Sequence, residues 1–464
     1  MTLRWRPLAT AAALLAVTAA LVGTGVGTSS AGPERPAACA RPTPEQPPPT
    51  PKPATFTTVG QAYYCIFDNY YSGPVLDSRS LLVPAFAAIT QELQRRGLDR
   101  ADATLPALTG RKDADWSAFG KVYRRIADAL PDDDARAAIA AAAVQAMVDA
   151  LDDNHARWMT RFTPNLYGLD LSVTVGPGDV DPVAAEPAHV NRILANGPAD
   201  AAGLELGDEV LAINDVPVFV NGILNTAVLS WLTEGRVGST VRLTVRRPVT
   251  GETFTATVTA AQVPSQRPSV VSRLVDGNIA YVTLPGFAPP LADQVLAAIA
   301  DLRAGTALRG VVLDLRGNGG GSPEAVAKLL GALAHGKVTS YWCDVRDRCT
   351  PNRTDDSVAL LNLPFVALTD RRCASACDSF TSAVKDLKLG TLVGTRTAGA
   401  VSGPGQPYLL DNGTVLGLPK HHEIAANKEV VNTIGVAPDH HVPTTAADLS
   451  AGRDPALDKA VSLL

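Results

Sequence analysis

The most constraining feature of this sequence is a regular alternation of strand-like and helix-like segments through its C-terminal part. Short aliphatic runs are followed by longer stretches in which apolar residues recur at helical spacing. In chain order, these segments are a strand at 279–284, a helix at 291–302, a strand at 310–315, a helix at 323–333, a strand at 365–368, a helix at 378–387 and a strand at 392–394. Alternation of this kind predicts an α/β fold in which helices cover a sheet.

Size and composition limit the classes of protein that remain open. The chain has 464 residues, which corresponds to about three domains of ordinary size. Hydrophobic residues make up 46% and charged residues 19%, which excludes a mainly disordered protein. The formal net charge is −5 and no long basic run is present, so no nucleic-acid partner is expected. Only one apolar stretch approaches membrane-spanning length, and it lies at the start, which excludes a polytopic membrane protein.

The first 31 residues have the pattern of a secretory signal peptide. Two arginines precede an apolar stretch at 8–26, and small residues at 29–31 offer a cleavage site. We therefore expect a secreted or extracytoplasmic protein with a signal peptide at 1–31. The alternative is an uncleaved segment that anchors the chain to a membrane, because its length is close to the ~20 residues that span a bilayer. Residues 32–55 follow as a proline-rich linker, which predicts an extended spacer.

All six cysteines lie beyond this segment, and an even number in an exported chain predicts disulfides. Six cysteines allow 15 pairings in principle. Proximity in sequence favours the pairs Cys39 with Cys65, Cys343 with Cys349, and Cys373 with Cys377. A zinc site is disfavoured because no C-x-x-C pair has a second pair at a matching distance. No metal or other cofactor is expected.

Two further domains are predicted between the linker and the alternating segment. Residues 56–165 read as a helical domain, with apolar residues at helical spacing and an alanine-rich final helix. Residues 166–264 change to short β-branched runs separated by turns. Within them, RILANGPADAAGLELGDEVLAINDVPV at 192–218 resembles a PDZ domain.

The PDZ resemblance implies a peptide-binding edge strand. Gly168, Leu169, Asp170 and Leu171 stand where that family has its carboxylate-binding loop. A glycine turn before an edge strand exposes backbone N–H groups to a terminal carboxylate, and the strand edge pairs with the peptide. The alternative is that the module only packs against its neighbours.

The strongest chemical signals are two strand ends in the α/β segment, which is expected to span residues 265–464. The first is VVLDLRGNGGG at 311–321, in which a buried strand runs into a glycine turn. Bare backbone N–H groups in such a turn suit an oxyanion hole or a phosphate cradle. The lysine of a P-loop and the G-x-G-x-x-G spacing are both absent, so phosphate binding is disfavoured. A purely structural turn is the remaining alternative.

The second is LTDRRCASACDSFTSAVKDL at 368–387, where a helix begins just after Ser375. A serine there has its hydroxyl near a helix N-terminus, and the Ala376 N–H can hold an anionic oxygen. The serine could also be an ordinary helix cap. A disulfide between Cys373 and Cys377 would straddle the serine and fix its position, so its reduction is expected to lower activity more than stability.

Several stretches together resemble peptidase family S41, which includes the carboxyl-terminal processing peptidases and the tricorn core. They are IAYVTLPGF, VVLDLRGNGGG, CASACDSFTSAVKDL, LVGTRTAGA and GVAPD, within residues 278–440. The order of a helical segment, a PDZ module and this core also matches the family. The resemblance implies a mixed-sheet α/β core of ClpP/crotonase type, with Ser375 as nucleophile. It implies oxyanion donors at Ala376 and at Gly320 or Gly321.

One position departs from the processing peptidases. Their general base is a lysine, and by spacing that position is Ala400 here. The motif LDDNHAR at 151–157 is instead similar to the histidine motif of the tricorn-like branch, which makes His155 the candidate base. A neutral imidazole titrates near pH 6.5 and can take the serine proton at neutral pH. The orienting group is expected just before GVAPD, at Asn432 or Glu429.

The sequence therefore predicts a secreted serine peptidase that acts on protein or peptide substrates through a Ser-His acyl-enzyme mechanism. The PDZ domain is expected to capture substrate C-termini. The alternative is a non-catalytic peptide- or lipid-binding scaffold with the same fold. Membrane association is expected only if the N-terminal segment stays uncleaved. The sequence gives no oligomeric state.

Overall fold

The computed structural model describes residues 36–42, 50–160, 166–175, 184–233, 235–262, 269–403 and 405–464. The predicted signal peptide at 1–31 and the centre of the proline-rich linker lie outside the described residues. Residues 36–464 belong to one compact unit.

A six-stranded sheet organises the C-terminal part, and it has the mixed character that the alternation predicts. Its spatial order is β10-β11-β12-β15-β16-β20, with β10 antiparallel to β11 and the other neighbours parallel. The strands are β10 (Ser272–Val275), β11 (Ile279–Thr283), β12 (Gly310–Asp314), β15 (Phe365–Thr369), β16 (Thr391–Gly394) and β20 (His440–His441). β12 and β15 are buried at every position, as expected for central parallel strands covered on both faces.

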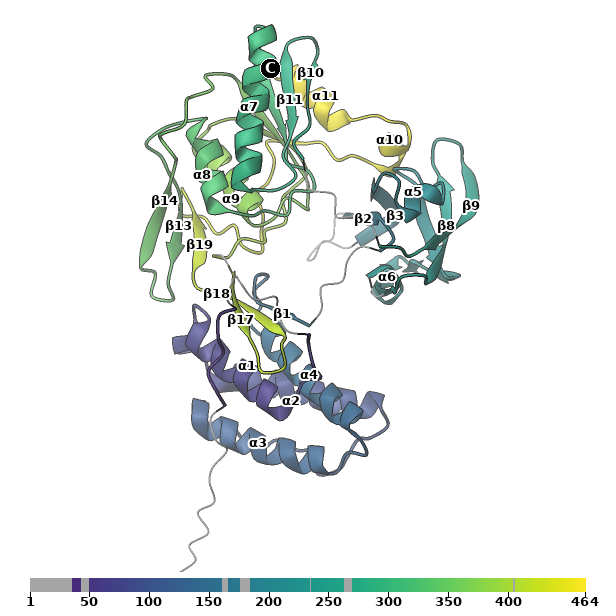
Figure 1. Cartoon of the computed structure of the whole chain (residues 1–464), viewed down its shortest axis with the longest axis vertical. Coiled ribbons are helices and arrows are strands. Elements are labelled where there is room, and N and C mark those ends of the chain that lie inside the picture. The colour runs from purple at the N-terminus through teal and green to yellow at the C-terminus, as the bar shows by residue number, and fades with distance from the viewer. Residues whose placement is uncertain are drawn as a thin grey trace, which may run out of the picture. The chain divides into compact units, whose positions relative to one another are not determined.

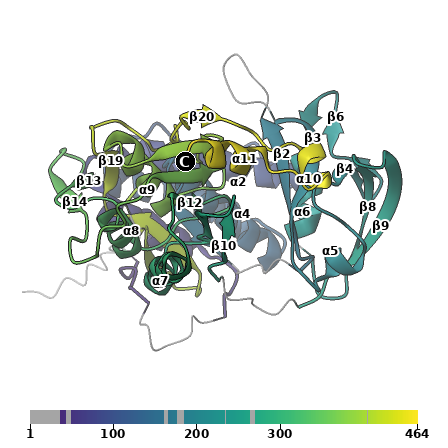
Figure 2. The ribbon, with the colours of Figure 1, turned by 90° about the horizontal axis from the view of Figure 1, so that it is seen from above.

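Helices cover both faces of this sheet (Figures 1 and 2). One face packs against α7 (Pro289–Gly305), α8 (Pro323–Gly331) and α9 (Ala376–Asp386). The other packs against α11 (Pro455–Ser462), whose Ala456 and Ala460 are fully buried among strand residues. A separate three-stranded sheet is formed by β13 (Val338–Cys343), β14 (Cys349–Arg353) and β19 (His422–Ala425) in the order β14-β13-β19.

The helical domain is also present, but its core includes a hairpin that comes from far along the chain. Its helices are α1 (Phe56–Asn69), η1 (Gly73–Val75), α2 (Ser78–Arg95), α3 (Lys112–Asp128) and α4 (Asp133–Asp149). β17 (Gly405–Leu409) and β18 (Val415–Pro419) lie against these helices (Figure 1), and Tyr408, Leu416 and Leu418 are buried in the same core. A division of the chain into consecutive segments does not anticipate this arrangement.

The hairpin also ties the end of the helical domain to the α/β part. β1 (Arg157–Met159) pairs antiparallel with β18, which itself pairs with β17. The described flanks of the proline-rich linker contact this assembly as well. Ala40 bridges to Leu409, and the Lys52 N–H donates to the Asn412 carbonyl at 2.7 Å. These flanks of the predicted spacer are therefore attached to the fold.

The PDZ-like domain is a six-stranded sheet, in which β5 pairs with β4 off the main order, with two helices. The sheet order is β2-β3-β4-β8-β9, so β2 is an edge strand. Its elements are β2 (Leu169–Val175), β3 (Ala184–Ile193), α5 (Pro198–Ala201), β4 (Glu209–Ile213), β5 (Val216–Pro217), β6 (Phe219–Val220), β7 (Ile223–Leu224), α6 (Thr226–Thr233), β8 (Thr240–Arg247) and β9 (Glu252–Thr259). α10 (Ala446–Ser450), from the C-terminal part, lies beside Gly207 of this domain.

The three disulfides pair as proximity predicts: Cys39–Cys65, Cys343–Cys349 and Cys373–Cys377. Among the described residues, no helix combines the length and apolar character that a bilayer crossing requires.

Candidate active site

The glycine turn and the loop before α9 meet because two parallel strands end side by side. β12 pairs with β15, so their carboxyl ends lie at the same edge of the sheet. The Ala374 N–H donates to the Asn318 carbonyl at 3.0 Å, which joins the two loops directly. A β-carbon on Gly320 would lie 2.7 Å from Ser375 Cβ and 2.9 Å from the Ala376 nitrogen. Only glycine at position 320 allows the turn to pack this closely against the loop that carries Ser375.

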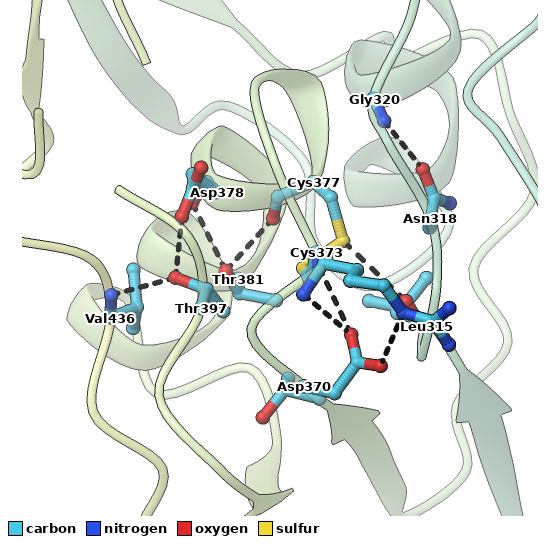
Figure 3. The surroundings of a disulfide bond; sticks show 12 residues. Leu315, Asn318, Gly320, Asp370, Cys373, Cys377, Asp378, Thr381, Thr397 and Val436 are labelled. Carbon is cyan, nitrogen blue, oxygen red and sulfur yellow. Dashed lines mark hydrogen bonds and ion pairs between the residues drawn. A yellow bond between two sulfur atoms is a disulfide. The ribbon is translucent and has the colours of Figure 1, made fainter. Parts of the chain in front are cut away.

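Ser375 has a backbone conformation that non-glycine residues rarely adopt. Its φ is 58° and its ψ is −117°, immediately before the first residue of α9. Such strain costs about 1–3 kcal/mol and persists only where surrounding contacts impose it. Here the Cys373–Cys377 disulfide, drawn in Figure 3, joins the residues two positions before and two positions after the serine. The strained serine at a strand-to-helix turn therefore has its position fixed from both sides.

Asp378, which was not among the residues predicted from sequence, is a second restraint on this turn. Its carboxylate is fully buried and accepts hydrogen bonds from the backbone N–H groups of Ser375 at 3.0 Å, Gly399 at 2.9 Å and Ala400 at 2.9 Å. The Thr397 hydroxyl donates to it as well (Figure 3). Asp378 thus ties the serine turn to the loop after β16. The available signal was an acidic residue in the first turn of the helix.

The predicted serine and histidine lie in direct contact. His155 Nε2 is 2.9 Å from Ser375 Oγ, although 220 positions separate the two residues. Asp153 holds the histidine turn: it accepts from the His155 N–H at 2.9 Å, the Ser402 hydroxyl at 2.8 Å and the Tyr70 hydroxyl at 3.0 Å. The turn is therefore fixed both to the helical domain and to the α/β part.

Asn154 determines which nitrogen of His155 carries the proton. Its Nδ2 donates to the Gly399 carbonyl at 3.0 Å and to Asn432 Oδ1 at 2.9 Å. These two acceptors assign the amide orientation, so Asn154 Oδ1 is the atom that faces His155 Nδ1 at 2.8 Å. The Ser402 N–H also points at Nδ1, but at 3.4 Å it makes the longer contact, so the oxygen at 2.8 Å assigns the proton to Nδ1. Nε2 of the neutral ring is then free to accept the Ser375 hydroxyl.

Asn432 is connected to the His155 imidazole through Asn154, by two successive hydrogen bonds. Its Oδ1 accepts from Asn154 and from the Val401 N–H at 3.1 Å. The residue in contact with His155 Nδ1 is therefore Asn154, and Asn432 in turn holds Asn154. Glu429, the other residue considered, is exposed. The sequence held one indication of this contact, because Asn154 immediately precedes the candidate base His155.

Burial lowers the pKa of the His155 imidazole below its ordinary value. Asp153 opposes this effect, while Arg157 acts in the same direction as burial. The net lowering favours the neutral ring that a general base requires.

Two backbone N–H groups are candidates to hold an anionic oxygen beside Ser375. Ala376 is the first residue of α9, so its N–H has no acceptor within the helix. The Gly320 N–H already donates to Asn318 Oδ1 at 2.9 Å (Figure 3), and its carbonyl accepts from the Phe287 N–H at 2.8 Å. Because the C=O and N–H of a trans peptide point in opposite directions, the Gly321 N–H points away from Phe287. Gly321 and Ala376 line the same cavity, so Gly321 fits the role better than Gly320.

No lysine takes the position that the processing peptidases use. Ala400 lies at the site, beside His155 and Ser375 in a cavity of about 310 Å³. Lys420, the next lysine along the chain, donates to Asn69 Oδ1 at 3.0 Å in the helical domain. Its ammonium is thus engaged elsewhere, which agrees with the interpretation that a Ser-Lys dyad is absent.

The residues predicted to form the PDZ carboxylate loop lie at the start of the edge strand. Gly168 has a φ of 69°, and Leu169, Asp170 and Leu171 begin β2, paired with β3. Asp170 accepts from Arg192 Nε at 2.6 Å. It also lies 3.8 Å from the guanidinium of Arg372, which belongs to the loop before Ser375.

Comparison with known proteins agrees with this geometry. A model of peptidase family S41 matches residues 278–442, and a PDZ domain model matches residues 189–247. A carboxyl-terminal-processing protease of Picosynechococcus sp. is 28% identical over 321 residues, which cover 65% of this chain and 72% of that protein. Tricorn protease homolog 1 of Streptomyces coelicolor is 31% identical over 315 residues, covering 64% of this chain and 28% of that one.

Among solved structures, mature CPAF complexed with lactacystin has a TM-score of 0.54 at 14% identity and covers 88% of this chain and 97% of that chain. That likeness supports the fold alone. The fold and the matched domains define the class as serine-type peptidases with an embedded PDZ domain. Residues 278–442 therefore carry a peptidase family S41 domain, and the chain is similar to carboxyl-terminal processing proteases and tricorn homologues.

Proposed function

We propose that this chain hydrolyses peptide bonds through a Ser375–His155 acyl-enzyme mechanism. The observation that carries the proposal is the 2.9 Å contact between His155 Nε2 and Ser375 Oγ, with Nδ1 protonated toward Asn154. His155 Nε2 takes the hydroxyl proton as Ser375 Oγ attacks the substrate carbonyl. The Ala376 and Gly321 N–H groups stabilise the oxyanion that forms.

The second half of the reaction follows from the same atoms. Protonated His155 gives its proton to the leaving amine as the carbon–nitrogen bond breaks, which leaves an ester on Ser375. A water molecule then loses a proton to His155 Nε2 and attacks the ester. His155 returns that proton to Ser375 Oγ as the ester bond breaks, which releases the acid and restores the Ser375 hydroxyl. Asn154 keeps Nδ1 protonated throughout, so Nε2 remains the nitrogen that exchanges protons.

The test uses a serine-directed phosphonate on the chain without its first 31 residues. The expected result is covalent labelling of Ser375, located by peptide mass mapping. Replacing Ser375 by Ala removes the attachment point, and His155→Ala removes the base, so both should abolish labelling. Labelling of His155→Ala at the wild-type rate would refute the assignment of the base.

We further propose that the protein is secreted or extracytoplasmic and that its PDZ domain captures substrate C-termini. The edge strand β2, with Gly168 before it, supports peptide pairing, and three disulfides agree with an oxidising compartment. Amidating the C-terminus of a peptide substrate should raise KM and leave kcat unchanged. Equal KM values for the free and amidated peptides would exclude C-terminal capture.

The competing candidate is a binding scaffold without turnover. It is favoured by one observation, since both groups behind the imidazole are neutral amides rather than carboxylates. The scaffold would leave the phosphonate unreacted and still bind peptides. Labelling of Ser375 would reject it.

A further inference from the structure

A second cavity, distinct from the one that holds His155 and Ala400, opens beside the nucleophile. Its volume is about 110 Å³, and Ser375, Ala376 and Gly321 line it together. Its sides are largely apolar and include Val326 of α8 and Val401. A substrate residue whose carbonyl oxygen is held by Ala376 and Gly321 would have its side chain beside this opening.

The lining of the cavity includes an acid, Glu423. Glu423 lies on β19 directly opposite Trp342 on β13, so the two side chains share one face of the small sheet. Trp342 Nε1–H donates to the Glu423 carboxylate at 3.1 Å, and both residues line the cavity. The indole thus fixes the direction of the carboxylate.

The environment of Glu423 lacks a compensating cation. In the part of the chain that the structure describes, no ion pair to lysine or arginine engages Glu423, although Arg353 also lines the cavity and is exposed. Burial raises the pKa of the Glu423 carboxyl, while hydrogen bonds from Ser340, Ser379 and Trp342 oppose that rise. A carboxylate with hydrogen-bond donors and no paired cation gains most from a positively charged partner.

We propose that Glu423 makes this cavity select a lysine or arginine side chain at the substrate residue whose carbonyl is attacked. The proposal rests on the Ser375–His155 function above and names its substrate class. The aliphatic stem of such a side chain packs against the apolar walls, and its charged end reaches the carboxylate. One water needs about 10–15 Å³, so the cavity has room for several groups of that size, as a lysine or arginine side chain requires.

The test compares internally quenched peptides that differ only at this residue, with lysine, arginine, norleucine, glutamine or aspartate there. Norleucine matches the stem of lysine without its charge. We expect kcat/KM for lysine and arginine to exceed that for norleucine at least tenfold. Glu423→Gln keeps the shape and an acceptor for Trp342, and it should reduce that ratio at least tenfold. Glu423→Asp keeps the charge on a shorter stem and should retain the basic preference while shifting it toward arginine.

Asp347→Asn is the matched control, because Asp347 has an 82% exposed side chain on the β13–β14 turn and lies outside the cavity. It should leave the lysine-to-norleucine ratio unchanged. Equal cleavage of lysine and norleucine peptides, faster cleavage of the glutamine peptide, or an unchanged ratio in Glu423→Gln would overturn the proposal.

A second measurement separates this inference from the proposed function. Phosphonates with a lysine-like or a norleucine-like side chain report selection at Ser375 without turnover. Faster labelling by the lysine-like reagent supports the proposal, and equal labelling rejects the selectivity but keeps the nucleophile. No labelling and no cleavage at all would reject the peptidase itself, and the selectivity with it.

Discussion

Replacing Gly320 by alanine should cripple the site without unfolding the protein. A β-carbon there would lie 2.5 Å from the Ala374 carbonyl oxygen, 2.7 Å from Ser375 Cβ and 2.9 Å from the Ala376 nitrogen, whereas ordinary contacts begin at 3.4 Å. The neighbours must therefore move by several tenths of an ångström or more. All three belong to the turn that carries the nucleophile and a candidate oxyanion donor.

The expected magnitude follows from that displacement. A shift of about 1 Å at a catalytic group costs on the order of 100-fold in rate, so kcat/KM and the phosphonate labelling rate should both fall by about that factor. The φ of Gly320 is 98°, and holding a non-glycine residue in such a conformation costs about 1–3 kcal/mol. Stability should fall by a similar amount, which a thermal melt measures.

Gly319→Ala is the matched control, because a β-carbon at Gly319 would have no atom within 4 Å. It should leave the melting temperature unchanged and lower the labelling rate by no more than a few-fold. If Gly320→Ala were labelled as fast as the unmodified protein, the close packing of the glycine turn against Ser375 would have no catalytic importance and the reasoning would fail.

Three further predictions concern the same site. Because burial lowers the pKa of His155, kcat/KM should fall on the acid side with an inflection below pH 6.5, as the imidazole becomes protonated. An inflection above pH 6.5 would contradict this prediction. Asn432→Asp adds a negative charge behind Asn154, so the same inflection should move to higher pH, as a pH series on the variant would measure. Replacing both Cys373 and Cys377 by alanine should lower kcat/KM at least tenfold. The free energy of unfolding should fall by no more than about 2 kcal/mol, which is the loop-closure contribution of so short a loop. Unchanged kcat/KM would show that the disulfide does not hold Ser375 in place.

The parts of this site that sequence predicts well are local in the chain. The glycine turn, Ser375 and the start of α9 each follow directly from a strand end, and parallel pairing brings the ends of β12 and β15 together. The disulfide pairing was predictable for the same reason, since two of the three bridges close very short loops. Such features depend on residues that are neighbours in sequence or on adjacent strands.

The parts that escaped prediction depend on contacts between distant segments. β1 pairs with β18 across more than 250 positions, with Arg157 opposite Gly417. Nothing in the local pattern of the β17–β18 hairpin indicates that it packs among helices of the N-terminal domain rather than on its own sheet. A motif resemblance identified His155, but the pairing of β1 is what brings it beside the α/β part. Asp378 was missed because its partners come from a loop that only the folded chain places nearby.

The two uncharged amides behind His155, Asn154 and Asn432, have an energetic consequence for the proposed catalysis. In the usual serine triad a carboxylate accepts the Nδ1 proton and stabilises the imidazolium by its charge. Here the acceptor is Asn154 Oδ1, and the group behind it is another amide. An amide preserves the tautomer only when its orientation is fixed, as Gly399 and Asn432 fix that of Asn154, and it gives less stabilisation to the charged ring than a carboxylate does. In the proposed mechanism, the amides add to the effect of burial in keeping the imidazole neutral to lower pH, while each proton transfer from Ser375 becomes less favourable. The proposed mechanism therefore predicts a lower rate at neutral pH, activity that extends to lower pH, and a strong dependence on the fixed position of Ser375.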